Sequence, residues 1–103
     1  MVNTAVLMGR LTTTPELRYT SSNVPVTSFT LAVNRSYVKS GSERQTDFID
    51  IVARSSTAEF VSTYFSKGQL IAVEGSIQTR TYQDKDGNNR KAFEVVANKV
   101  HFA

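Results

Sequence analysis

Apolar and polar residues alternate along five stretches of the chain, and clusters of turn-forming residues separate these stretches. Successive side chains of a β-strand point to opposite faces, so a period of two predicts strands with one buried face. The predicted strands span residues 3–12, 26–37, about 46–54, 70–82 and 91–102. This pattern predicts a mostly β protein.

The alternation also assigns side chains to faces. In the second strand it places on one face Phe29, Leu31 and Val33. In the third strand it places inward Ile49, Ile51 and Ala53, and on the opposite face Phe48, Asp50, Val52 and Arg54. In the fourth strand one side holds Ile71, Val73 and Ile77, and the other holds Glu74, Ser76, Gln78, Arg80 and Tyr82. In the first strand, Gly9 predicts a bulge or sharp bend.

One helix is predicted between the third and fourth strands. The run Ser56-Thr57-Ala58-Glu59 fits a capping box, and apolar residues at helical spacing follow it up to Phe65. Gly68 is expected to end the helix. A polar loop is predicted at 39–44 and a hairpin turn at 84–89.

Five strands with a single helix after the third favour an all-β OB-fold, a five-stranded Greek-key barrel, over a sandwich of about seven strands. With 103 residues, the chain is expected to form one domain, 1–103, and a domain this small often gains stability by oligomerising. An OB-fold offers an open sheet face to oligonucleotides or oligosaccharides, which suggests a binding protein.

The composition excludes several functions. There is no cysteine, and His101 is the only histidine, so we expect no metal site, no cofactor and no catalytic residues. No apolar run reaches the roughly 18 residues of a membrane span, and the first twenty residues lack a basic start followed by an unbroken apolar run, so a soluble, cytoplasmic protein without membrane contact is expected. A net charge of +3 favours polyanionic partners only weakly.

Aromatic and basic residues interleave along the predicted strands. Exposed rings can stack on unpaired bases, and Tyr37, Phe48 and Tyr82 are the candidates. Two alternatives stay open: Phe48 packs under the helix or at a subunit interface, and the two tyrosines cap the barrel ends. The guanidinium groups of Arg10, Arg54 and Arg80 either bind phosphates and bases, or are solvated or paired with Asp50 or Glu74.

Several segments, in this order and spacing, resemble the bacterial single-stranded DNA-binding protein family over essentially the whole chain. They are Met8-Gly9-Arg10-Leu11-Thr12, Pro15-Glu16-Leu17-Arg18-Tyr19-Thr20, Phe29-Thr30-Leu31-Ala32-Val33-Asn34-Arg35, Asp47-Phe48-Ile49, Lys67-Gly68, Val73-Glu74-Gly75, Gln78-Thr79-Arg80 and Glu94-Val95-Val96.

The resemblance implies an OB-fold homotetramer that binds single-stranded DNA without sequence specificity or catalysis, at the nucleoid, during replication, repair and recombination. It assigns base stacking to Tyr37, Phe48 and Tyr82. It assigns backbone contacts to basic residues on the strands and in the two long hairpins, namely Arg10, Arg35, Lys39, Arg44, Arg80, Lys85 and Lys91.

The chain departs from the family pattern at two places. Where the family usually has another aromatic residue followed by basic ones, this chain has Arg54-Ser55-Ser56, which predicts weaker binding or a changed site size. The sequence stops at Ala103, where family members typically continue to an acidic tip that recruits other enzymes. We therefore expect DNA binding without recruitment through that tip.

Three other functions are weighed against this one. A dimeric OB-fold primosomal replication protein is similarly short. An OB-fold interaction or oligosaccharide-binding module is a second alternative, although secreted members more often carry a signal peptide and disulfides. An enzyme is the third, and no nucleophile with a neighbouring base supports it.

Overall fold

The structure, a computed structural model, describes residues 1–35 and 45–103. Along these residues the chain forms, in order, β1 (Ala5–Leu11), β2 (Arg18–Tyr19), β3 (Pro25–Asn34), β4 (Thr46–Arg54), α1 (Ser55–Tyr64), β5 (Leu70–Gln83) and β6 (Asn89–Phe102). The predicted strands and helix are therefore present, with ends that shift by a few residues. The predicted loop at 39–44 and the end of the second predicted strand lie outside the described residues.

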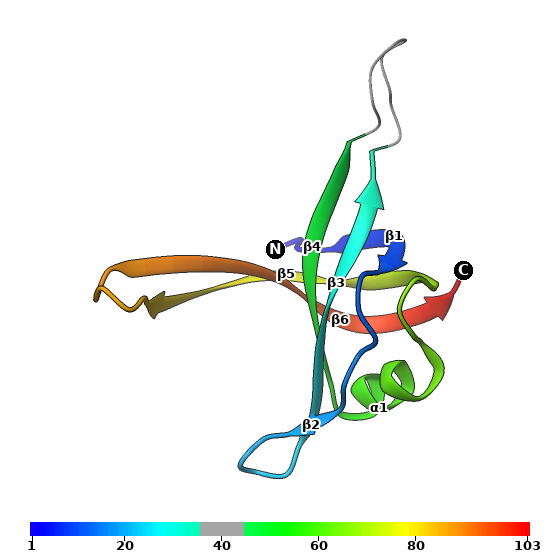
Figure 1. Cartoon of the computed structure of the whole chain (residues 1–103), viewed down its shortest axis with the longest axis horizontal. Helices are drawn as coiled ribbons and strands as arrows, with labels where there is room; N and C mark the ends of the chain where they lie inside the picture. The colour runs from blue at the N-terminus through cyan, green and yellow to red at the C-terminus, as the bar shows by residue number, and fades with distance from the viewer. Residues whose placement is uncertain (36–44) are drawn as a thin grey trace.

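Five of the strands close into a ring (Figure 1). The sheet order is β1-β5-β6-β4-β3-β2, and an additional pairing of β1 with β3 closes it, with β2 appended to β3 outside the ring. β4 and β6 run parallel, while the other pairs are antiparallel. This connectivity confirms the predicted OB-fold, a five-stranded Greek-key barrel.

The barrel interior contains the side chains that the alternation placed inward. Leu31, Ile51 and Ala53 are fully buried, as is Val73 on β5. α1 packs against β3, β4 and β6 and adds Ala58, Val61 and the following Phe65 to the same core (Figure 1). The sheet alone leaves this end of the barrel open, so the helix completes the apolar core.

The helix starts and ends differently from the prediction. It begins at Ser55, directly after β4, and the N-cap residue is Arg54, with no side-chain capping hydrogen bond. The predicted capping box is wrong, because the strand leads into the helix one residue earlier and a guanidinium has no acceptor for the first N–H groups. The helix ends at Tyr64, and Gly68 lies beyond it in a turn, at φ +87°, where its N–H donates to Leu11 O at 2.8 Å.

β5 and β6 are each 14 residues long, and their hairpin projects from the barrel (Figure 1). We call the paired residues 77–83 and 89–95 with their turn the arm. Ile77, on the apolar side of β5, is 49% exposed, because no second layer covers that side beyond the barrel.

The register irregularity lies between Glu74 and Gly75, where the ladder skips Asn98, rather than at Gly9 as predicted. Gly75 is required there because a Cβ would collide with the Val96 carbonyl. Gly9 instead allows the β3 backbone at Ala32 to approach closely.

Candidate nucleic-acid interface

The outer face of β4 carries the residues that the alternation assigned to it. Phe48 is 68% exposed, and Arg54 at the end of the strand is also exposed, while Ile51 between them is fully buried. Phe48 therefore does not pack under the helix, since α1 lies at the other end of the strand (Figure 1). A phenylalanine on a solvated strand face is available for stacking.

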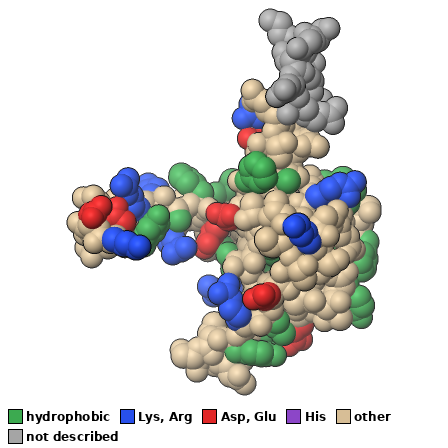
Figure 2. Space-filling view, viewed as in Figure 1, with side chains coloured by type: hydrophobic (Ala, Val, Ile, Leu, Met, Phe, Trp, Pro, Cys, Tyr) green, Lys and Arg blue, Asp and Glu red, His purple; other side chains and the backbone are tan. Residues whose placement is uncertain are grey.

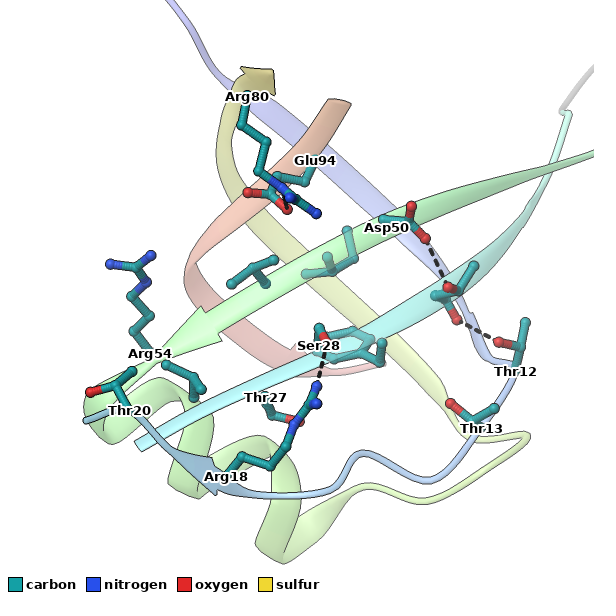
Figure 3. A pocket seen from close by; sticks show the side chains of 15 residues that line it. Thr12, Thr13, Arg18, Thr20, Thr27, Ser28, Asp50, Arg54, Arg80 and Glu94 are labelled. Atoms are coloured by element: carbon teal, nitrogen blue, oxygen red, sulfur yellow. Dashed lines mark hydrogen bonds and ion pairs between the residues drawn. The ribbon is translucent and has the colours of Figure 1, made fainter. Parts of the chain in front are cut away.

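A groove of about 570 Å³ runs over β3 and β4 beside the arm (Figure 3). Three arginines line it, namely Arg18, Arg54 and Arg80. Hydroxyl groups also line it, those of Thr12, Thr13, Thr20, Thr27, Ser28 and Thr30. Two carboxylates, of Asp50 and Glu94, complete its polar lining. Guanidinium and hydroxyl donors at this density suit the phosphates of a polyanion.

Individual contacts hold the groove side chains in place. The Arg18 Nη2 donates to Ser28 Oγ at 3.1 Å, and Thr30 Oγ1 donates to Asp50 Oδ1 at 2.9 Å. Thr27 Oγ1 is buried and has no hydrogen-bond partner among the described residues. The position of Arg18 beside Tyr19 in the sequence suits a subunit contact as readily as a groove, and the structure places Arg18 in the groove.

Arg80 and Tyr82 lie on the arm half of β5. The Arg80 Cζ lies 5.7 Å from the centroid of the Tyr82 ring, a cation–π distance. The Arg80 Nε also lies 3.8 Å from Glu94 Oε2 on β6. Tyr82 is 46% exposed, so part of its side chain remains accessible to solvent beside the guanidinium.

The arm carries most of its charge near the turn (Figure 2). Lys85 and Lys91 are exposed there, and the Arg90 Nε donates to Asp84 Oδ2 at 2.9 Å. The Asp84 Oδ1 accepts the backbone N–H groups of Asp86 and Asn88. The Arg90 hydrogen bond, followed by these N–H groups, lowers the pKa of Asp84 below its ordinary value.

Arg35 forms an ion pair with Asp47 at the end of the β3–β4 pairing. Its Nε and Nη2 both donate to the Asp47 carboxylate at 3.1 Å, and its Nη1 donates to Gln45 Oε1 at 2.6 Å. This bidentate contact lowers the pKa of Asp47 and raises that of Arg35.

The other predicted site residues fall into two groups. Arg10 lies on β1, apart from the groove, and its Nη1 donates to Gly68 O at 3.1 Å. Tyr37, Lys39 and Arg44 lie outside the described residues. The structure thus brings Arg54 and Arg80 together in the lining of the groove. Phe48 lines a neighbouring cavity that shares Asp50 and Glu94 with the groove, and Tyr82 lies beside Arg80.

Phe93 was missed from the sequence. It lies on β6 opposite Thr79, has the same alternation phase as the buried Val95, and is 66% exposed. The alternation marks it as an inward residue, but it lies on the arm, where there is no interior. β6 has 14 residues, whereas an average strand has about five or six. This unusual length is the signal that one end of the strand extends beyond the barrel and that Phe93 can be exposed there.

His101 Nε2 lies 3.0 Å from Glu74 Oε2 on the neighbouring strand. Among the described residues, no group of three or more His, Cys, Asp or Glu side chains is arranged to hold a metal ion. In the same part of the chain, no helix is long and apolar enough to span a membrane.

The fold and this surface define an OB-fold protein with an exposed aromatic and basic face. Residues 2–103 match the single-strand binding protein family, so the chain belongs to that family. It is 55% identical over 102 residues to the single-stranded DNA-binding protein of Caldanaerobacter subterraneus subsp. tengcongensis, covering 99% of this chain and 68% of the relative.

Two further relatives agree with this assignment. Identity is 49% with single-stranded DNA-binding protein 1 of Staphylococcus aureus strain MSSA476 and 47% with single-stranded DNA-binding protein 2 of Listeria monocytogenes. Each alignment covers 99% of this chain, and 65% and 64% of the respective relatives. The chain thus spans about two thirds of the length of the curated relatives it matches.

Proposed function

We propose that this protein binds single-stranded DNA without sequence preference, by stacking bases on aromatic rings and neutralising phosphates with Arg and Lys. The observation that carries the proposal is a groove lined by Arg18, Arg54 and Arg80, with exposed Phe48 in the cavity next to it and exposed Tyr82 beside Arg80. Stacking on a ring accepts any base, and guanidinium groups contact the backbone, so neither contact reads sequence. The names of the relatives support the same ligand.

The remaining predicted contacts belong to this proposal. Tyr37 is proposed as a further stacking residue. The basic residues proposed along the backbone path are Arg10, Arg35, Lys39, Arg44, Lys85 and Lys91. Arg35 and Arg10 already have protein partners, so we expect smaller contributions from them than from Arg54.

The proposal is tested by titrating the protein into a labelled oligo-thymidine strand and into the matching duplex, following fluorescence anisotropy at two salt concentrations. Tight binding to the single strand that weakens with salt, and little binding to the duplex, is expected. Equal affinity for the single strand and for the duplex contradicts the proposal and favours an OB-fold interaction or oligosaccharide-binding module. Cleavage of the strand in the presence of divalent metal contradicts its non-catalytic character.

Arg54 offers a test of the stacking mechanism at one position. Its side chain borders the groove at the junction of β4 and α1, where an aromatic ring would add a platform (Figure 3). We expect Arg54→Trp to raise affinity for oligo-thymidine by about 1 to 3 kcal/mol or to change the number of nucleotides covered. The chain has no tryptophan, so quenching of the introduced one reports stacking directly. Unaltered affinity and site size contradict the idea.

We further propose that the protein assembles as a homotetramer and covers exposed strands in replication, repair and recombination, at the nucleoid. Val6 and Met8 on β1 are 68% and 56% exposed, and apolar side chains gathered on a surface strand support association. Light scattering separates this tetramer from the dimer of a primosomal protein.

A further inference from the structure

A second, smaller cavity lies where β4 meets the arm. We call it the cleft: it has a volume of about 270 Å³, and its apolar lining consists of Phe48 and Ile49 on β4, Ile77 on β5, and Phe93 and Val95 on β6. Three of these side chains, those of Phe48, Ile77 and Phe93, come from three strands and do not contribute to the buried core of the barrel. They are 68%, 49% and 66% exposed.

Neither Phe48 nor Phe93 stacks on another aromatic ring of the described residues. In residues 1–35 and 45–103, the close aromatic pairs involve only Phe60, Tyr64, Phe65 and Phe102, at the helix and the end of β6. Phe48 and Phe93 therefore line a common space without stacking on each other. Exposed apolar side chains grouped around one cavity are typical of ligand-binding grooves and of contacts with other proteins.

The cleft adjoins the polar groove. Asp50 and Glu94 line both cavities. Each carboxylate already has a partner, since Thr30 Oγ1 donates to Asp50 and the Arg80 Nε faces Glu94 at 3.8 Å. A polyanion in the groove therefore meets three arginines and two partnered carboxylates, and the apolar cleft opens beside its path.

We infer that the cleft is a base-binding site in which Phe93 supplies a second aromatic wall opposite Phe48. The occupant is one unpaired nucleobase of a strand whose backbone follows the groove; this inference rests on the proposed function. A cavity of 270 Å³ is below the usual 300–1,000 Å³ of ligand pockets, which suits one flat ring better than a peptide segment. Stacking between two aromatic walls is available to any of the four bases.

Three single variants test the site: Phe93→Ala, Phe93→Tyr and, as a matched control, Tyr64→Ala. Tyr64 is 58% exposed on α1, so it is an exposed ring away from the cleft. Each is titrated at low salt with an oligo-thymidine strand and with an abasic strand of equal length, which keeps the phosphates and lacks the bases. Phe93→Ala should bind oligo-thymidine about 5- to 150-fold more weakly, with unchanged affinity for the abasic strand. Phe93→Tyr and Tyr64→Ala should bind like the parent.

A double-mutant cycle with Phe48→Ala tests whether both rings hold the same base. The double variant should lose less affinity than the product of the two single losses, because the base is already released when either wall is removed. Multiplicative losses would show that Phe93 and Phe48 act at separate positions, and would overturn the shared site.

Three sets of outcomes separate this inference from its alternatives. If Phe93→Ala weakens binding to both strands equally, or to neither, the base-binding role is wrong. If light scattering shows that Phe93→Ala changes the assembly, a second copy of the chain covers the cleft, and the inference is also wrong. If the parent itself fails to bind oligo-thymidine, the proposed function fails before the variants are compared.

Discussion

The two halves of β5 differ although they form one continuous strand. Within the barrel, residues 70–76 alternate between buried and half-buried, and Ile71 and Val73 are fully buried. On the arm, every residue of 77–83 is exposed, and these residues include Arg80 and Tyr82. Both halves keep the same antiparallel pairing with β6.

In this strand, pairing of the backbone with β6 therefore does not determine whether the side chains are buried. The alternation of side chains is a property of the strand, but burial needs a second layer opposite one face, and only the barrel supplies it. Side chains in the barrel half stabilise the fold, whereas those on the arm are available to a ligand. Substitutions in the arm half should therefore leave the stability of the fold unchanged, and substitutions in the barrel half should leave the ligand-contacting side chains of the arm in place.

The largest effect is expected in the barrel half. Ile71→Ala removes a fully buried side chain and leaves a cavity, so the free energy of unfolding should fall by about 2–5 kcal/mol. Urea unfolding followed by circular dichroism, at one fixed protein concentration, measures it. Thr79→Ala on the arm is the matched control and should change stability by less than about 0.5 kcal/mol. A similar loss from both variants would show that the arm is part of the cooperative core.

The next effect is expected on the arm. Tyr82→Ala removes the ring beneath Arg80 and should weaken binding of oligo-thymidine by about 1–3 kcal/mol, while Tyr82→Phe keeps most of the affinity. Anisotropy titration gives the affinity, and thermal melting should match the parent. A lowered melting temperature for Tyr82→Ala would contradict the separation of the two halves.

The sequence predicts most of the fold because, throughout the barrel, successive side chains of each strand point alternately into the apolar core and out toward solvent. Ile51 and Ala53 are buried and Phe48 is exposed, as the period of two requires. The errors lie where another influence decides. The start of α1 follows from the end of β4 rather than from a cap. The exposure of Ile77 follows from the projection of the hairpin beyond the barrel, which the alternation of residues does not reveal.

The site is only partly predictable for the same reason. Arg54 and Arg80 were identified from their strand faces, and both line the groove. Arg18 remained ambiguous because a groove is formed by segments distant in sequence. Phe93 was missed because its phase in β6 matches that of buried Val95, and only the position of the arm outside the barrel exposes it.

A smaller effect is expected for Arg80→Gln. Removing one phosphate contact should reduce the slope of log affinity against log salt by about 0.7. The loss of affinity should be smaller than for Tyr82→Ala, because Arg80 already faces Glu94. Lys67→Gln, an equal change of charge at an exposed position after α1, is the control and should leave the slope unchanged. Equal slopes for the parent and both variants would exclude Arg80 from the backbone path.

The smallest effect is expected at the arm turn on acidification. The folded state lowers the pKa of Asp84, so its contribution to stability is complete above the ordinary pKa and is lost as pH falls through the folded value, below about pH 4. Protonation weakens the Arg90 contact and the turn hydrogen bonds to Asp86 and Asn88. Amide exchange should then show reduced protection in the turn, while the Val73 amide in the barrel stays protected. Asp84→Asn cannot titrate and should remove this pH dependence; its persistence in that variant would assign the transition to another carboxylate.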